Sequence, residues 1–243
     1  MKIEPLRGDP LADAAPAWYA QIVAGMEIAQ FDLQEPEAKA LVGERLREAD
    51  LLLTSMRPHA IARVDLDWPA LHPRYPRLCS VALIGESPPD EDRPGHDLTY
   101  QARAGTIAPP ALPRVLVADM AAAERIVGVA LALLLRRERT GEAGFANVAI
   151  TEVAQDFAAP YLHGLTGERG VLGGGLPAYN LYAARDGWVA VAALEPHFAQ
   201  RLQAMLEIER LDADAIGAAF AQRTAQEWET LAQHHDLPLA AIR

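Results

Sequence analysis

The amino-acid sequence predicts an α/β fold, with an incomplete Rossmann-like parallel sheet layer covered by helices and a second, smaller α+β domain. Two observations lead to this prediction. Helical and strand-like segments alternate along the first part of the chain, as they do where parallel strands are joined by helices. A stretch with six glycines over residues 164–175 then precedes a hairpin pattern. We therefore expect a large domain over residues 1–165, and a linker and small domain over residues 166–243.

The first domain begins with a segment, residues 1–20, whose prolines, glycines and aspartates predict a loop anchored by its aromatic side chains. Residues 35–50 have helical spacing, and the apolar run Leu51–Thr54 that follows suits a buried strand. Residues 78–84 predict a second strand. A helix is expected from Asp97 to Ala104.

The second half of this domain contains the clearest helix of the sequence, Asp119–Arg139. An Asp at its start and arginines before Gly141 at its end match the helix dipole and the usual end signals. The apolar run Val115–Ala118 before it predicts a strand. Another strand is expected over residues 145–150, and a helix over residues 151–165.

The second domain begins with two short strand-like segments, residues 179–184 and 188–193, around Asp186-Gly187. Asp-Gly between such segments is a strong hairpin signal. Two helical stretches follow, residues 196–206 and 213–233, and a capping box that begins at Thr224 divides the latter in two.

Composition excludes several classes of function. The chain has 243 residues and a formal net charge of −11, so it lacks the positive field that nucleic acids and anionic membranes attract. Its one cysteine, Cys79, excludes an intrachain disulfide and argues against a cysteine-rich zinc site, and we expect no metal. The longest apolar run is too short to cross a bilayer, and the first residues lack a secretion signal. We expect a cytoplasmic protein.

Two residues are candidates for proton chemistry. His96 follows a Pro94-Gly95 turn and begins a predicted helix, and histidine is well suited to proton transfer near neutral pH. The alternative is a surface histidine. Asp119 opens the long helix, whose N-terminus should hold a carboxylate ionised. The alternative is an ordinary helix cap.

Gly173-Gly174-Gly175 and Glu195 form a third feature. A triple glycine lets the backbone approach a ligand or move as a lid, although a plain linker fits equally well. Glu195 precedes a proline and could simply cap the next helix.

Many short strings of the sequence, in order, resemble the family III CoA-transferases (the CaiB/BaiF family), and within them the α-methylacyl-CoA racemases. The most similar string runs from Arg93 to Gly105 and includes His96-Asp97-Leu98. The others are Lys2-Ile3-Glu4-Pro5, Gly8-Asp9-Pro10, Phe31-Asp32-Leu33, Ala49-Asp50-Leu51-Leu52, Arg57-Pro58, Val117-Ala118-Asp119, Arg137-Glu138-Arg139-Thr140-Gly141, Gly173-Gly174-Gly175-Leu176-Pro177-Ala178-Tyr179, Asp186-Gly187 and Ala193-Leu194-Glu195-Pro196.

The resemblance implies roles for individual residues. Asp119 matches the carboxylate that carries the acyl group in the transferases and moves a proton in the racemases. His96 matches the racemase histidine, and Glu195 a carboxylate that supports it. Arg57 falls where the family contacts coenzyme A. The glycines Gly173, Gly174 and Gly175 match a loop that closes over the acyl group.

The histidine favours an acyl-CoA racemase or epimerase, because inversion at the carbon next to a thioester needs one proton-transfer group on each face. A backbone N–H near Asp97 is the natural donor for the enolate oxygen. Two alternatives stay open. One is a family III CoA-transferase in which Asp119 is the acyl-carrying nucleophile, and the other is a non-catalytic or repurposed member.

The sequence departs from the family pattern in three places. Relatives carry a strand and a helix ahead of Lys2-Ile3-Glu4-Pro5 and continue beyond Arg243, so we expect a chain truncated at both ends. The segment Val23–Gln30 replaces a basic segment, which removes positive charge from the expected CoA phosphate site. The resemblance also implies a homodimer, possibly interlocked, and a small-molecule acyl-CoA thioester as substrate with no permanently bound cofactor.

Overall fold

The structure, a computed structural model, describes residues 1–242. The chain divides into two compact units, Met1–Asp156 and Phe157–Arg243. The expected domain boundary after residue 165 falls inside the second unit and stays a prediction, because compactness does not test which segments fold independently. None of the helices in residues 1–242 is long and apolar enough to cross a membrane.

A parallel sheet forms the centre of the first unit. It consists of β3 (Leu51–Thr54), β4 (Cys79–Ile84) and β5 (Phe145–Ala149), in that order across the sheet. Leu51 pairs with Cys79 and Ser80 pairs with Phe145, both in parallel register. The central strand, β4, is buried at every position except Leu83, as expected for a strand covered on both faces. The predicted α/β class is confirmed.

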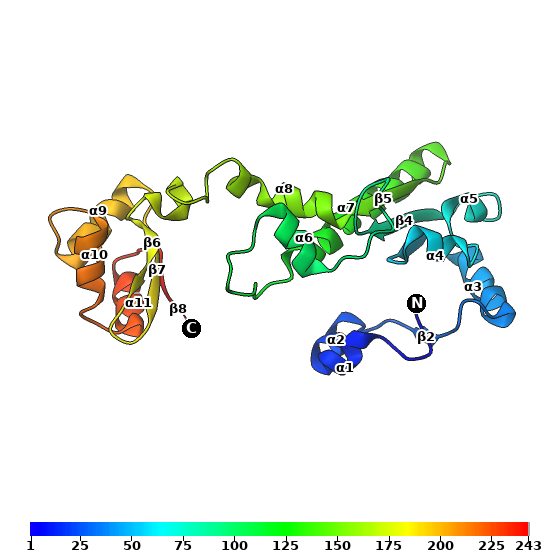
Figure 1. Ribbon diagram of the computed structural model, residues 1–243, viewed down its shortest axis with the longest axis horizontal. Helices are drawn as coiled ribbons and strands as arrows, with labels where there is room; N and C mark the ends of the chain where they lie inside the picture. Colours follow the sequence, from blue (N-terminus) through cyan, green and yellow to red (C-terminus); the bar gives the residue numbers. More distant parts are fainter. Residues whose placement is uncertain (243) are drawn as a thin grey trace. The chain divides into compact units, whose positions relative to one another are not determined.

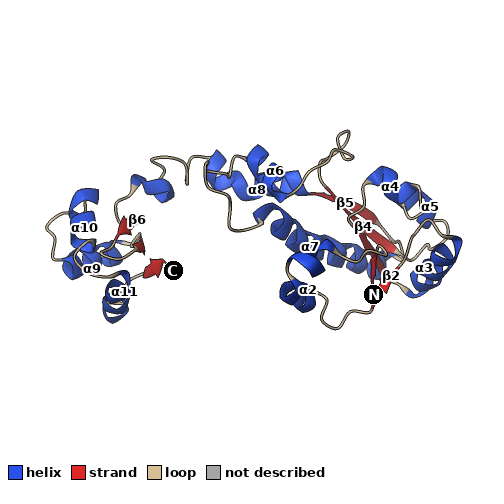
Figure 2. Cartoon of the chain, turned by 60° about the horizontal axis from the view of Figure 1, so that its bottom comes forward, coloured by secondary structure: helices blue, strands red, loops and turns tan. Residues whose placement is uncertain are grey.

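Helices cover both faces of this sheet. Figures 1 and 2 show α7 on one side of β4 and β5, and α3, α4 and α5 on the other. The apolar stripe of α3 packs Val42 and Leu46 against Leu71, Tyr75 and Leu78. The bounds of the helices that follow the first strands are α3 Pro36–Glu48, α4 Pro58–Ala62, α5 Trp68–Leu71, α6 Asp97–Ala104, α7 Val117–Thr140 and α8 Ile150–Leu162.

The predicted strand over Val115–Ala118 is wrong. Val117 and Ala118 already belong to the first turn of α7, and Leu116 is its N-cap residue. The helix begins early because the buried carboxylate of Asp97 accepts a hydrogen bond from the backbone N–H of Ala118. A four-residue apolar run cannot by itself distinguish a strand from a buried helix start.

The predicted N-terminal loop is also wrong. β1 (Lys2–Glu4) pairs in parallel with β2 (Ile28–Gln30), and α1 (Pro10–Ala14) and α2 (Pro16–Ile22) lie between them. The prolines that predicted a loop occupy the first positions of these two helices, where proline is well tolerated. The hydroxyl of Tyr19 does anchor the segment, donating to Glu4 at 2.6 Å, whereas Trp18 is exposed.

The second unit is an α+β arrangement. The predicted hairpin is confirmed as β6 (Tyr179–Ala183) and β7 (Trp188–Ala192), and the unpredicted β8 (Leu239–Ile242) pairs antiparallel to β7. The helices are α9 (Pro196–Leu206), α10 (Ala213–Phe220) and α11 (Ala225–His234). The Thr224 capping box is present at the start of α11, with the Thr224 N–H donating to Glu227 at 2.7 Å.

Candidate active site

The candidate active site of the first unit lies where α6 and α7 begin. His96 is the N-cap residue of α6 and its side chain is exposed. Thr99 holds the backbone at this position: its hydroxyl accepts from the His96 N–H at 3.1 Å and donates to the His96 carbonyl at 2.8 Å. The imidazole is therefore presented to solvent from a fixed backbone.

Asp97, the next residue along the chain, is buried, with 4% of its surface exposed. One carboxylate oxygen, Oδ1, accepts from the backbone N–H groups of Ala118 at 2.9 Å and of Asp119 at 3.1 Å. The other oxygen accepts from Gln101 Nε2 at 2.6 Å. Asp97 was expected to contribute only its backbone, so the role of its side chain was missed.

Asp119 lies in the first turn of α7 and is half-buried. Burial raises the pKa of its carboxyl group above the usual value, the negative charge of Asp97 raises it further, and His96 acts in the opposite direction. The helix N-terminus was expected to favour the ionised form of Asp119. Burial and the like charge of Asp97, which the sequence does not reveal, act in the opposite direction. The influence of His96 shows that the two side chains lie within electrostatic range of each other.

Tyr100 is a further residue of this site that the sequence did not single out. It is buried, and its side chain lies close to two glycines: an added Cβ atom would clash with the hydroxyl oxygen at Gly85 and with the ring at Gly95. Burial is the largest cause that raises the pKa of its hydroxyl, and the negative charge of Asp119 is the second. Gly85, Gly95 and Tyr100 can each be read from the sequence, but the sequence does not indicate that they are in contact, because only the fold brings them together.

Arg57 is close enough to Tyr100 for its charge to act on the hydroxyl. It is exposed and precedes α4 as its N-cap residue, without a side-chain capping bond. Its positive charge lowers the pKa of the Tyr100 hydroxyl, as does that of Arg103, whereas Glu86 raises it. Within the first unit, His96, Asp97 and Asp119 thus lie where α6 and α7 begin, and the charges of Asp119 and Arg57 act on the Tyr100 hydroxyl.

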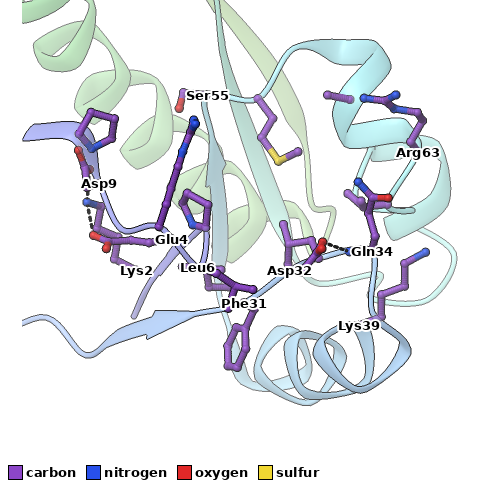
Figure 3. Close-up of a pocket in the computed structure, with 18 residues that line it drawn as sticks. Lys2, Glu4, Leu6, Asp9, Phe31, Asp32, Gln34, Lys39, Ser55 and Arg63 are labelled. Atoms are coloured by element: carbon purple, nitrogen blue, oxygen red, sulfur yellow. Dashed lines mark hydrogen bonds and ion pairs between the residues drawn. The ribbon is translucent and has the colours of Figure 1, made fainter.

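A cavity of about 1060 Å³ lies beside β1 and the segments that follow β2 and β3. Figure 3 shows Lys39 and Arg63 at one side of it and Lys2 with Asp9 at the other. The cationic side chains in its lining are Lys2, Arg7, Lys39 and Arg63. Of these, Lys2 is bonded to Glu4 at 2.7 Å and to Asp9 at 2.5 Å, and Lys39 to Asp65 at 3.0 Å. We predicted that the segment Val23–Gln30 removes positive charge from the CoA phosphate site. That prediction did not point to this cavity, whose cationic side chains come from other segments.

The other predicted residues belong to the second unit. Gly173, Gly174 and Gly175 lie in a π-helical turn, η1 (Val171–Gly175), where a Cβ at Gly173 would come within 2.0 Å of a backbone oxygen. Gly174 has a φ of 94°, which only glycine adopts readily. Gly173 and Gly174 also line a cavity of about 680 Å³ with Leu172.

Glu195 is exposed at the N-cap of α9, and its side chain forms no capping bond.

Comparison with known proteins gives the family. The sequence model of CoA-transferase family III matches residues 1–243, and the chain belongs to this family. A CaiB/baiF CoA-transferase family protein of Caenorhabditis elegans, ZK892.4, is 25% identical over 89% of this chain and 72% of its own length. The cinnamoyl-CoA:phenyllactate CoA-transferase of Clostridium sporogenes is 36% identical over 43% of this chain and 29% of its own length. The succinyl-CoA–D-citramalate CoA-transferase of Chloroflexus aurantiacus is 26% identical over 84% of this chain, and the match covers 57% of that enzyme.

Solved structures have the same fold. The Mycobacterium tuberculosis protein Rv3272 matches all of this chain over 75% of its own, with a TM-score of 0.83 and 24% identity. A CAIB/BAIF family protein from Brucella suis gives a TM-score of 0.81 at 19% identity, again over the whole of this chain. Identities this low support the fold alone.

Proposed function

We propose that this chain handles acyl-CoA thioesters by CoA transfer, with Asp119 as the acyl-carrying nucleophile. The observation that carries the proposal is a half-buried carboxylate at the start of α7 whose pKa is raised by burial and by Asp97. A desolvated carboxylate of raised pKa is a stronger nucleophile once ionised than a solvated one. The named transferases among the relatives support this choice over a racemase.

The reaction begins with attack of an Asp119 carboxylate oxygen on the thioester carbonyl carbon. The C–S bond breaks, the thiolate of CoA leaves, and the acyl group stays on Asp119 as a mixed anhydride. The backbone N–H groups at the start of α6, next to Asp97, are our assignment for the donors to the oxyanion. Return of the thiolate to the aspartyl carbonyl releases the donor acid, and an acceptor carboxylate then takes up CoA by the same steps in reverse.

We assign the cavity beside β1 to coenzyme A. Its volume of about 1060 Å³ is in the range of large ligand sites, and four cationic side chains line it. Phosphate groups are recognised by such cations, most specifically by arginine. Arg7 and Arg63 supply the charge for this role. Arg57 remains our proposed contact for CoA nearer the reacting group, because its charge acts on Tyr100.

An acyl-CoA racemase is the second candidate, and His96 is the observation that favours it. Its charge acts on the carboxyl group of Asp119, and in this candidate we assign the two groups to the acid/base pair that inversion requires. A raised pKa also makes Asp119 a better base toward a carbon acid. The roles that the resemblance implies for Glu195 and for Gly173–Gly175, which belong to the second unit, stay predictions.

One incubation separates the candidates. The protein is mixed in D₂O with a 2-methylacyl-CoA and a ¹³C-labelled carboxylate acceptor and followed by NMR. Transfer predicts a new ¹³C thioester without deuterium at the α-carbon of the donor, and racemisation predicts α-deuterium without the new thioester. Absence of both contradicts the proposed chemistry and favours a non-catalytic member.

Variants test whether either activity depends on Asp119. Asp119→Asn should abolish transfer, because the amide cannot accept the acyl group. Glu124→Gln is the matched control, since Glu124 is an exposed carboxylate on the same helix. Equal losses in both variants would contradict the assignment of Asp119.

A further inference from the structure

We propose that Asp97 is a positioning residue that fixes the two reacting side chains relative to each other through a single carboxylate. Asp97 is the chain neighbour of His96, and its Oδ1 accepts from the backbone N–H of Asp119 at 3.1 Å. The inference rests on the proposed function, which assigns both of these neighbours to the reaction.

The carboxylate is itself held rigidly. Asp97 is buried, with 4% of its surface exposed, so its orientation is set by protein contacts. Gln101, one helical turn along α6, donates from Nε2 to Asp97 Oδ2 at 2.6 Å. The same nitrogen donates to the carbonyl of Val115 at 3.0 Å, just ahead of α7. The side chains of Asp97 and Gln101 therefore link α6 to the start of α7. They bind three backbone groups there: the N–H groups of Ala118 and Asp119 and the carbonyl of Val115.

This arrangement has two consequences for Asp119. The first is geometric: if the carboxylate is removed, the N–H groups of Ala118 and Asp119 lose their acceptor, and the first turn of α7 is free to move. The second is electrostatic: the negative charge of Asp97 acts on the carboxyl group of Asp119 and favours its protonated form. The charged and titratable groups around Asp119 are His96 and Asp97, with Tyr100 adjacent and Glu86, Arg103 and Arg57 beyond it.

Two variants separate these consequences. Asp97→Asn keeps an oxygen for the two N–H groups and removes the charge. The amide of Gln101 has to rotate to meet the new NH₂ group, and it thereby gives up its bond to the Val115 carbonyl. Asp97→Ala removes both. Asp212→Asn is the matched control, because Asp212 caps α10 of the second unit through the N–H of Ala215 at 2.9 Å.

The experiment measures the single-turnover rate of Asp119 acylation against pH, together with the carboxyl titration of Asp119 by ¹³C NMR. For Asp97→Asn we expect the acid limb and the NMR titration of Asp119 to move together to lower pH, with the rate at high pH largely kept. For Asp97→Ala we expect a fall of about 100-fold in rate with an unchanged KM, the loss typical of a misplaced reacting group. Asp212→Asn should change neither profile.

An unmoved Asp119 titration in Asp97→Asn, or a loss in Asp97→Ala no larger than in the control, would overturn the proposal. If Asp97→Ala fails to fold, Asp97→Asn still decides the question. If the wild-type protein forms no acyl-enzyme, the proposed function fails, while the NMR titration still tests the role of Asp97.

Discussion

The carboxylate of Asp97 lies against the backbone of Asp119, accepting its N–H at 3.1 Å, although the two residues are 22 positions apart in the chain. This contact joins the starts of α6 and α7, the two helices that present His96 and Asp119. The pKa of the Asp119 carboxyl group is raised by burial and, next, by the negative charge of Asp97. One buried side chain thus shapes both the geometry and the charge of the candidate site.

The raised pKa of Asp119 predicts a link between pH and stability. A carboxyl group whose pKa is higher in the folded than in the unfolded protein contributes stability below its unfolded pKa, about 3.9, and loses that contribution as the pH rises through its folded pKa. Asp119→Asn should therefore unfold at a higher temperature than the wild-type protein at pH 7, and the difference should shrink towards pH 4. Thermal unfolding across this range checks the prediction. A difference that is constant with pH, or equally present in Glu124→Gln, would contradict it.

The cavity beside β1 predicts which cations hold coenzyme A. Arg7→Ala and Arg63→Ala should each weaken CoA binding by about tenfold, the loss expected for a charged hydrogen bond. The losses should become smaller at high salt, because exposed charges are screened. Calorimetric titration with CoA measures both effects. Arg47→Ala is the control, an exposed arginine of α3 outside the cavity lining, and a loss there as large as at Arg63 would argue against the assignment.

The close approach of Gly85 and Gly95 to Tyr100 predicts that Tyr100→Phe restores the stability lost in one glycine variant but not in the other. A Cβ atom at Gly85 would lie 2.4 Å from the Tyr100 hydroxyl oxygen and 3.2 Å from Cζ, so Gly85→Ala should cost about 1–3 kcal/mol and Tyr100→Phe should recover most of it. A Cβ at Gly95 would lie 2.5 Å from Cε1, an atom that Phe retains, so Gly95→Ala should not be rescued.

Chemical denaturation of the single and double variants measures this cycle. Gly128→Ala is the control, because no atom outside its own stretch of helix lies within 4 Å of the added Cβ and alanine favours the interior of α7 by about 1 kcal/mol. Equal rescue at Gly85 and Gly95 would show that Tyr100 does not lie as described.

Arg137 predicts how the far end of α7 is fixed to the sheet. Its side chain is buried, donating from Nη1 to the carbonyl of Arg77 at 3.0 Å and pairing through Nη2 with Asp50 at 2.8 Å. Arg137→Met should keep the apolar packing, leave these acceptors without their donor, and cost about 1–3 kcal/mol. Arg139→Met, an exposed position two residues on, should cost little by the same denaturation assay. Similar costs at both positions would mean that the buried contacts do not stabilise α7.

The features that were predictable from the sequence are local ones. The hairpin between β6 and β7 follows from its Asp186-Gly187 turn, and the start of α11 from the spacing of Thr224 and Glu227. The parallel strands follow from apolar runs alternating with helices. In each case the determining residues lie within a few positions of one another.

The features that were missed depend on contacts between distant segments. Asp97 caps a helix that begins about twenty residues later, and no short pattern reports this. β8 is a four-residue strand that is defined by its pairing with β7. The raised pKa of Asp119 was also missed, because the start of its own helix is visible in the sequence, whereas its burial and the charge of Asp97 are not.

The most direct test of the account is the identification of the acylated residue. The full chain is incubated with an acyl-CoA, quenched with hydroxylamine, and digested for mass spectrometry. We predict a hydroxamate on the peptide that contains Asp119, formed by the wild-type protein and by Glu124→Gln and absent from Asp119→Asn. A hydroxamate on another residue, or one that persists in Asp119→Asn, would contradict the central claim that Asp119 carries the acyl group.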